Sequence, residues 1–170
     1  MKHNLVYYGK DTLKQTALPV EEFNSELKDL SEEMFLIMKK NNGIGLAAPQ
    51  INLSRRIITI ELSVNDSASR FVIVNPEIEW LSDDRVPYEE GCLSIPGIYE
   101  NVDRPSAVKV RGYDLNGNKL TYDAENVFAR VLQHEIDHLN GILFIDRIEE
   151  FIRKEYLKEL KKIKKMNRDK

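Results

Sequence analysis

The chain has 170 residues, of which 42% are apolar and 31% charged, a balance that excludes a disordered protein and fits one globular domain with its own core. It has no apolar run of about 18 residues and no apolar stretch near its start, so we expect neither a membrane partner nor a secretory signal. A single cysteine, with no transit-peptide features, favours a bacterial cytoplasm. The net charge of −3 argues against binding to DNA.

Charge is distributed unevenly along the chain. Residues 153–170 hold nine basic and three acidic residues, a net charge of +6, whereas the remaining residues hold 16 basic and 25 acidic ones. A basic tail on an acidic body predicts contact between the tail and an anionic partner. The alternative is a solvated helix end whose basic side chains complement the helix dipole.

The first predicted element is a helix. Apolar residues recur every three or four positions over residues 20–40, which predicts an amphipathic helix that residues 41–43 (NNG) terminate. Residues 43–50 (GIGLAAPQ) are mostly small and include two glycines. We expect a loop there, in which the backbone closely approaches another group.

Strands are predicted in the middle of the chain. Residues 56–62 and 71–75 are rich in β-branched and aromatic residues, and residues 77–81 alternate between polar and apolar. Residues 107–113 and 119–122 flank the sequence Asn-Gly at 116–117, which is a strong signal for a β-hairpin. These segments therefore predict mostly antiparallel strands.

Helical periodicity returns after Asp123 and stops at Asn140-Gly141, and a last amphipathic helix is predicted over about residues 149–166. The order of helix, strands, helix and helix predicts an α+β fold. Because we find no linker or repeat, we expect one domain over residues 1–170, with residues 149–170 forming a basic C-terminal helix.

Residues 134–138 (HEIDH) carry the metal-binding pattern HExxH. On a helix, His134 and His138 share one face and can bind the same metal ion, while Glu135 beside them can accept a proton from a metal-bound water. Apolar neighbours indicate that this helix is buried. Two buried imidazoles are costly unless they bind a metal or are hydrogen-bonded, so two hydrogen-bonded core histidines are the alternative.

A catalytic site of this type needs a third protein ligand. The metzincin pattern, with a third histidine ten residues after the first, fails because that position holds Phe144. Cys92 is one candidate, since a thiolate and two imidazoles suit a borderline-soft divalent metal, although a lone cysteine is more commonly a small core residue. As in other zincins, a glutamate of the last helix could serve instead, and the candidates are Glu149, Glu150, Glu155 and Glu159.

Three segments resemble the signature motifs of the peptide deformylases, namely residues 43–50 (GIGLAAPQ), 90–94 (EGCLS) and 133–141 (QHEIDHLNG). They occur in the family's order and at family-like separations, and the likeness extends over nearly the whole chain. Chain length, Leu46 and the terminal amphipathic helix are similar to the type I bacterial group. The resemblance implies an N-terminal helix, mostly antiparallel strands around a central metal-binding HExxH helix, and a C-terminal amphipathic helix.

The resemblance also implies a reaction, which is hydrolysis of the N-formyl group on the first methionine of new polypeptides, with release of formate. Glu135 would be the general acid and base, and the Gln50 amide and the Leu93 backbone N–H would stabilise the developing negative charge on the formyl oxygen. The family's native metal is Fe(II), and zinc, nickel or cobalt can occupy the same site. The implied ligands of this single divalent metal are Cys92, His134 and His138.

Other residues are implied to bind substrate or support the site. Glu90 and Arg104 would pair with each other and brace the loop that carries Cys92. Tyr99 stands near the position where some type I members have a peptide-binding arginine. Ordinary core packing is the alternative for the residues implied to contact the substrate, which are Ile44, Gly45, Tyr88, Gly91, Val127 and Val131.

The resemblance gives the basic tail a partner, because in some type I members a basic C-terminal helix docks on the ribosome, whose RNA is a polyanion. Two other functions stay open. A zinc peptidase that uses a later glutamate would not need Cys92. A metal-stabilised ribosome-binding module would need neither Glu135 nor Gln50.

Overall fold

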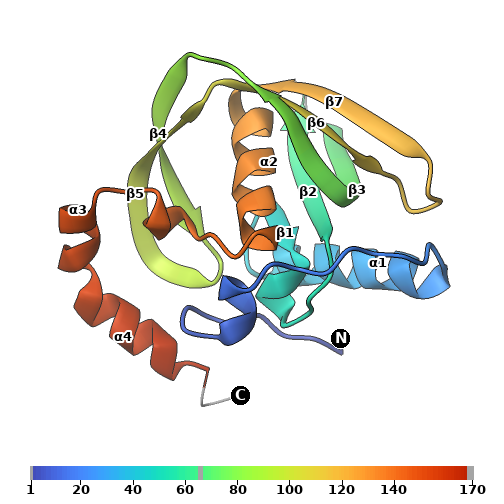
Figure 1. Ribbon diagram of the computed structural model, residues 1–170. Coiled ribbons are helices and arrows are strands. Elements are labelled where there is room, and N and C mark those ends of the chain that lie inside the picture. The colour runs from blue at the N-terminus through green and yellow to red at the C-terminus, as the bar shows by residue number, and fades with distance from the viewer. Residues whose placement is uncertain (1, 65–66, 168–170) are drawn as a thin grey trace.

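In the computed structural model, which describes residues 2–64 and 67–167, helix α2 lies between a five-stranded sheet and a two-stranded hairpin (Figure 1). The sheet has the order β1-β2-β3-β6-β7, and the hairpin consists of β4 and β5. The helices are α1 (Ser25–Lys40), α2 (Asn126–Leu139), α3 (Glu150–Glu155) and α4 (Leu157–Lys165), and the 3-10 turns are Asp11–Lys14, Ala48–Ile51 and Phe144–Asp146. The strands are β1 (Gly45–Ala47), β2 (Ile57–Val64), β3 (Ser67–Leu81), β4 (Arg85–Cys92), β5 (Ile95–Pro105), β6 (Ala107–Tyr113) and β7 (Lys119–Glu125).

The described strand pairs are all antiparallel, which confirms the predicted α+β class. The hairpin predicted at Asn116-Gly117 is confirmed as the β6–β7 connection, where Gly117 adopts a positive φ of 84°. The predicted end of α2 at Asn140-Gly141 is also confirmed. Among the described residues, no helix has the length and apolarity needed to cross a membrane.

Helix α1 starts later than the apolar spacing predicts. Asn24 caps the helix, because its side-chain oxygen accepts a hydrogen bond from the backbone N–H of Leu27 at 3.2 Å. The preceding Val20 lies outside the helix and donates its N–H to the Asn75 side chain at 2.8 Å. The apolar residues before the cap therefore pack from an extended segment.

The glycine-rich segment at residues 43–50 is not the predicted loop. Residues 45–47 pair with residues 58–60 as strand β1, and the segment then turns through a 3-10 helix that contains Gln50. The strands predicted at 71–75 and 77–81 form one strand, β3, which is irregular between them because Asn75 adopts a positive φ of 50°.

Two further elements differ from the sequence-based predictions. The β4–β5 hairpin was not predicted, because Pro87 interrupts the short alternation of Val86 and Tyr88 and argues against a strand. The helix expected over residues 149–166 is two helices that meet at Tyr156, and the apolar Phe151 of this segment is 66% exposed, although an amphipathic helix would bury its apolar residues. Residues 168–170 of the basic tail lie outside the described residues.

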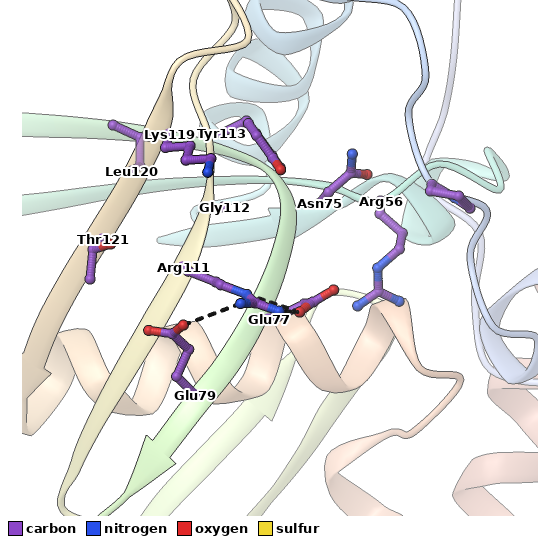
Figure 2. Close-up of a pocket in the computed structure, with 11 residues that line it drawn as sticks. Arg56, Asn75, Glu77, Glu79, Arg111, Gly112, Tyr113, Lys119, Leu120 and Thr121 are labelled. Carbon is purple, nitrogen blue, oxygen red and sulfur yellow. Dashed lines mark hydrogen bonds and ion pairs between the residues drawn. The ribbon is translucent and has the colours of Figure 1, made fainter.

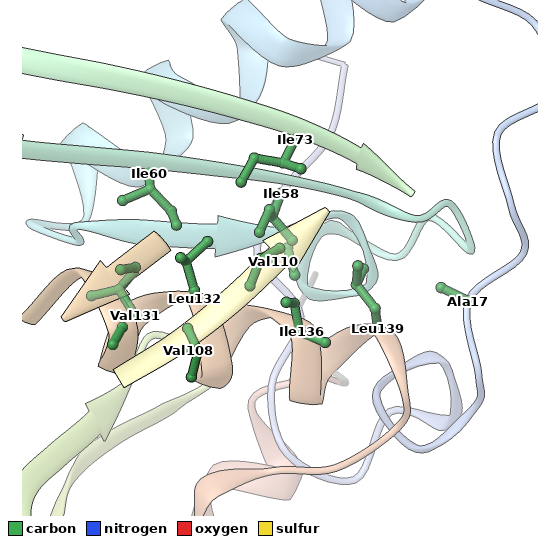
Figure 3. Close-up of a cluster of buried hydrophobic side chains, with 13 residues drawn as sticks. Ala17, Ile58, Ile60, Ile73, Val108, Val110, Val131, Leu132, Ile136 and Leu139 are labelled. Carbon is green, nitrogen blue, oxygen red and sulfur yellow. The ribbon is translucent and has the colours of Figure 1, made fainter. Parts of the chain in front are cut away.

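The main core fixes α2 against the inner face of the sheet (Figure 3). Each fully buried aliphatic side chain in this layer contributes roughly 1.5–3 kcal/mol, so α2 is held rigidly. The buried residues that form the contact include Ile58, Ile60, Ile73, Val108 and Val110 of the sheet, and Leu132, Ile136 and Leu139 of α2.

Candidate active site

Three metal-ligating side chains from two elements converge between the hairpin and α2. Cys92 ends β4, and His134 and His138 lie one turn apart on α2. One donor atom from each lies within 4.8 Å of the others, and Cys92 Sγ is 3.2 Å from His138 Nε2. A thiolate and two imidazoles suit a borderline-soft divalent metal, so these residues fit a catalytic metal site with an open fourth position.

The convergence discriminates between the candidate third ligands. In the part of the chain that the structure describes, the group of metal-ligating side chains contains Cys92 and none of the four C-terminal glutamates. The zinc peptidase alternative therefore has none of its four candidate ligand glutamates in this group. Among the described residues, the buried Glu135 Oε2 has no hydrogen-bond partner, as expected where a water would bind.

The Glu135 carboxyl is almost completely buried and touches the backbone of β1. A Cβ atom placed on Gly45 would collide with Glu135 Oε1, so only glycine allows the strand to approach this closely. Burial raises the pKa of Glu135 to about 7. This carboxyl can therefore gain and lose a proton near neutral pH, which is the property required of a general acid and base.

The Gln50 side chain is held by one end and presents the other to the metal-ligating group. Its Oε1 accepts a hydrogen bond from the Ala47 backbone at 2.8 Å, while its Nε2 lies 3.5 Å from Cys92 Sγ and 3.4 Å from Ser94 Oγ. Leu93 follows Cys92, and its side chain packs against Gly43. Residues 43–50 and residues 90–94, which resemble the first two family motifs, therefore lie in contact around Cys92.

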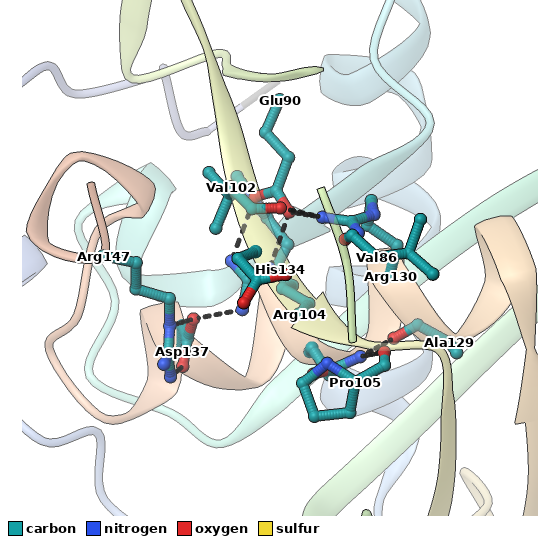
Figure 4. A network of polar contacts seen from close by, with 12 residues as sticks. Val86, Glu90, Val102, Arg104, Pro105, Ala129, Arg130, His134, Asp137 and Arg147 are labelled. Atoms are coloured by element: carbon teal, nitrogen blue, oxygen red, sulfur yellow. Dashed lines mark hydrogen bonds and ion pairs between the residues drawn. The ribbon is translucent and has the colours of Figure 1, made fainter. Parts of the chain in front are cut away.

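Glu90 lies behind His134 and accepts hydrogen bonds on both carboxylate oxygens (Figure 4). Oε1 accepts from Arg104 Nε at 2.6 Å and Arg130 Nη1 at 2.7 Å, and Oε2 accepts from Arg104 Nη2 and His134 Nδ1, both at 3.0 Å. Burial alone would raise the pKa of Glu90, but the hydrogen bonds from His134 and Arg104 hold it well below its ordinary value. Because this carboxylate can only accept, His134 carries its proton on Nδ1 and leaves Nε2 free for a metal.

Arg104 links Glu90 to a second buried acid on α2. Its Nη1 donates to Asp137 Oδ2 at 2.7 Å, and Arg147 also pairs with Asp137. Burial alone would lower the pKa of Arg104, but the two carboxylates raise it. The buried charge cluster consists of Glu90, Arg104, Arg130 and Asp137.

The resemblance implied Glu90 and Arg104 but neither Arg130 nor Asp137. Both of these lie on the buried helix α2, where a charged side chain among apolar residues is unusual without a partner. The sequence signal that could have identified Arg130 and Asp137 is the presence of charged residues within the otherwise apolar sequence of α2.

A pocket of 210 Å³ opens beside the hairpin. Of the residues implied to contact substrate, Tyr88 and Val127 line this pocket, and about half of each side chain is exposed. Val131 is instead buried against Gly45. Gly91 lies under the Tyr99 ring, and Ile44 is half exposed at the start of β1. The full lining is Val86, Tyr88, Pro105, Ser106, Asn126, Val127 and Arg130.

A larger hollow of 590 Å³ lies on β3, β6 and β7, on the face opposite α2 (Figure 2). Its floor holds an exposed ion-pair group, in which Arg111 contacts Glu77 at 2.5 Å and Glu79 at 3.4 Å. We name Glu77, Glu79 and Arg111 the sheet-face cluster. Cys92, His134 and His138 do not line this hollow, so it is separate from the candidate metal site.

A converging thiolate and imidazole pair with a buried, titratable carboxyl defines a metallohydrolase site. The family model described as polypeptide deformylase matches residues 2–154. A peptide deformylase of Phenylobacterium zucineum is 45% identical over 151 residues, which are 88% of this chain and 89% of the relative. The chain therefore belongs to the polypeptide deformylase family.

Solved structures agree with this assignment. The crystal structure of the plant peptide deformylase PDF1B matches with a TM-score of 0.93 and 35% identity, over 99% of this chain and 92% of that one. The peptide deformylase of Synechococcus elongatus, solved in complex with actinonin, matches with a TM-score of 0.85 and 39% identity, over 95% of this chain and 85% of that one. The predicted family is confirmed.

Proposed function

We propose that this chain hydrolyses the N-formyl group of the initiator methionine on newly made polypeptides and releases formate, in a bacterial cytoplasm where such chains emerge. The observation that carries the proposal is the convergence of the Cys92, His134 and His138 donor atoms next to the buried Glu135 carboxyl. Membership of the polypeptide deformylase family supports the same reaction.

Cys92, His134 and His138 hold one divalent metal, with Fe(II) as the native ion and zinc, nickel or cobalt as substitutes. When bound, the metal lowers the pKa of a water molecule and so supplies the nucleophile near neutral pH. The hydrogen bond from His134 Nδ1 to Glu90 keeps the other imidazole nitrogen directed to the metal.

Glu135 moves the proton in this reaction. Its carboxylate accepts a proton from the attacking water and delivers it to the leaving amine, and a pKa of about 7 suits both steps. The Gln50 Nε2 and the Leu93 backbone N–H stabilise the negative charge that develops on the formyl oxygen. Gln50 is preorganised for this task because its Oε1 is fixed by the Ala47 N–H.

The substrate's methionine side chain enters the pocket beside the hairpin. A cavity of 210 Å³ lined by Val86, Tyr88 and Val127 matches an unbranched apolar side chain. Gly45 lies against Glu135 and Val131, and it and the neighbouring Ile44 would bind the peptide through their backbone. Gly91, under the Tyr99 ring, would contact the substrate from the hairpin side.

Formate release tests the proposal. Protein purified without oxygen and loaded with metal should release formate from formyl-Met-Ala-Ser, and Glu135→Ala should lose about 10²–10⁴-fold in kcat while it keeps its metal. Glu159→Gln, on an exposed helix face, is the matched control and should keep wild-type activity. No release from folded, metal-loaded wild type would overturn the assignment, and cleavage of unformylated peptides by Cys92→Ser would favour the peptidase alternative.

We propose the ribosome as a partner because α4 presents a basic face. Leu160 and Ile163 are buried on one side of this helix, and its lysines are exposed on the other. Basic side chains give salt-dependent affinity for ribosomal RNA. Removing the tail after Arg153 would also delete these two residues and expose the apolar cluster that they cover, so charge reversal is the better test.

The variant changes four exposed lysines of α4 to glutamate and should co-sediment less with ribosomes than wild type at low salt. Its turnover of short formyl peptides should stay at the wild-type level. Equal co-sedimentation of the two proteins would exclude this partner. The four lysines are Lys158, Lys161, Lys162 and Lys165.

A further inference from the structure

The metal-ligating residues come from two separate elements, so their alignment depends on how the hairpin docks on α2. Cys92 belongs to the two-stranded hairpin, whereas His134 and His138 belong to a helix fixed in the main core. A two-stranded hairpin is marginally stable by itself in water. Residues 85–89 of β4 are exposed and add little apolar burial, so this end of β4 depends on polar contacts, whereas Val102 opposite it on β5 is buried.

Arg130 makes more of these contacts than its neighbours on α2. Its Nη1 donates to Glu90 Oε1 at 2.7 Å and to the Val102 carbonyl at 2.9 Å, and its Nη2 donates to the Val86 carbonyl. Val86 and Glu90 lie on β4, and Val102 lies on β5. One guanidinium on the helix thus binds both strands of the hairpin.

The setting of this guanidinium makes the contacts strong. The Arg130 side chain is only 12% exposed, and its charge faces the buried Glu90 carboxylate. The Tyr88 ring lies against it, with the guanidinium carbon 5.5 Å from the ring centroid. Planar, charge-assisted contacts of this type fix geometry better than a lysine could.

We infer that Arg130 is a positioning residue that clamps the β4–β5 hairpin to α2 and so holds Cys92 in register with His134 and His138. It acts on the metal ligands through Glu90 and through the two hairpin carbonyls. Arg104 also ties the hairpin to α2, through Asp137, but it reaches the helix from β5 at this one residue, whereas Arg130 reaches from the helix to both strands of the hairpin. The inference rests on the proposed function, which assigns the three ligands.

The test uses Arg130→Met and Arg130→Lys, with Arg85→Met as the matched control. Arg85 lies on the same hairpin but pairs with the exposed Asp103 at 2.8 Å, within the hairpin itself. The first measurement is the rate at which Co(II)-loaded protein loses its metal to a chelator. The second is amide hydrogen exchange over residues 85–105 in the metal-free protein.

We expect Arg130→Met to lose Co(II) at least about tenfold faster than wild type, the scale of effect seen for residues that support metal ligands. Its hairpin amides should exchange faster, Arg130→Lys should fall between Arg130→Met and wild type, and Arg85→Met should match wild type. If Arg130→Met does not fold, Arg130→Lys is compared with Arg85→Met instead.

The inference is overturned if Arg130→Met matches Arg85→Met in both measurements. If Arg130→Met does not fold, the same result with Arg130→Lys overturns it. Neither measurement uses turnover. A failure of formate release in wild type is therefore distinguishable from a failure of the clamp.

Discussion

Two groups of arginines and carboxylates in this molecule have similar chemistry and opposite surroundings. In the buried charge cluster, the Arg104 side chain is 2% exposed and that of Glu90 5% exposed. In the sheet-face cluster, Arg111 and Glu77 are each 58% exposed (Figure 2). Water solvates the second group whether or not the pair forms, whereas in the first each charge depends on its protein partners. Burial, more than the contact distance, decides what each arginine contributes.

The largest effect should follow from removing the central arginine of the buried charge cluster. Arg104→Met leaves Glu90 and Asp137 buried with fewer compensating charges, so we expect the free energy of unfolding to fall by about 3–5 kcal/mol. Urea denaturation of the metal-free protein measures this. A loss below about 1 kcal/mol, the range of surface pairs, would remove the distinction between the two clusters.

A smaller effect is expected where one charge is removed but a polar side chain remains. Asp137→Asn keeps the shape of the side chain and weakens its hydrogen bonds with Arg104 and Arg147. We expect a loss of about 1.5–3 kcal/mol in the same urea titration, which is typical of hydrogen bonds to charged groups. Stability equal to that of wild type would show that Glu90 alone is enough to neutralise the buried charge of Arg104.

Glu61 offers an intermediate case, because it is partly covered and pairs with Lys39 and Arg70. The hydrogen bond from Lys39 outweighs burial and, with that from Arg70, lowers the pKa of Glu61 below its ordinary 4.5. A lowered pKa in the folded state contributes stability above the ordinary value, and this contribution is lost as the pH falls through the folded pKa. Wild type should therefore exceed Glu61→Gln in stability at neutral pH.

Urea denaturation of both proteins at several pH values measures the difference between them. The two should converge as the pH falls from 4.5 towards the folded pKa. A difference that stays constant over this range would mean that the charge of Glu61 contributes nothing.

The smallest effect is expected on the exposed side. Arg111→Met removes both contacts of the sheet-face cluster, yet the glutamates that remain are solvated. The midpoint of thermal unfolding should match that of wild type within measurement error. A marked fall would show that the 590 Å³ hollow is structurally coupled to the sheet core.

A second contrast, between contacts that are local and contacts that are long-range along the chain, explains which features the sequence predicts. The HExxH helix, the Asn116-Gly117 hairpin and the cysteine motif depend on residues that are close along the chain, and the structure contains the helix and the hairpin as expected. The partners of Arg130 lie up to 44 residues away along the chain, so no local pattern reveals them. Tyr156 breaks the last helix where its hydroxyl bonds to Glu100 at 3.0 Å, a contact that only the fold creates.

The central claim is that Cys92 completes a metal site with the two histidines of α2. X-ray absorption spectroscopy of zinc-loaded protein tests it most directly, because a thiolate lies at about 2.3 Å from zinc and imidazole nitrogens at about 2.0–2.1 Å. We predict one sulfur and two imidazole nitrogens around the metal, and loss of the sulfur in Cys92→Ser. A zinc shell of nitrogen and oxygen alone in the wild-type protein would contradict the claim and point to a glutamate as the third ligand.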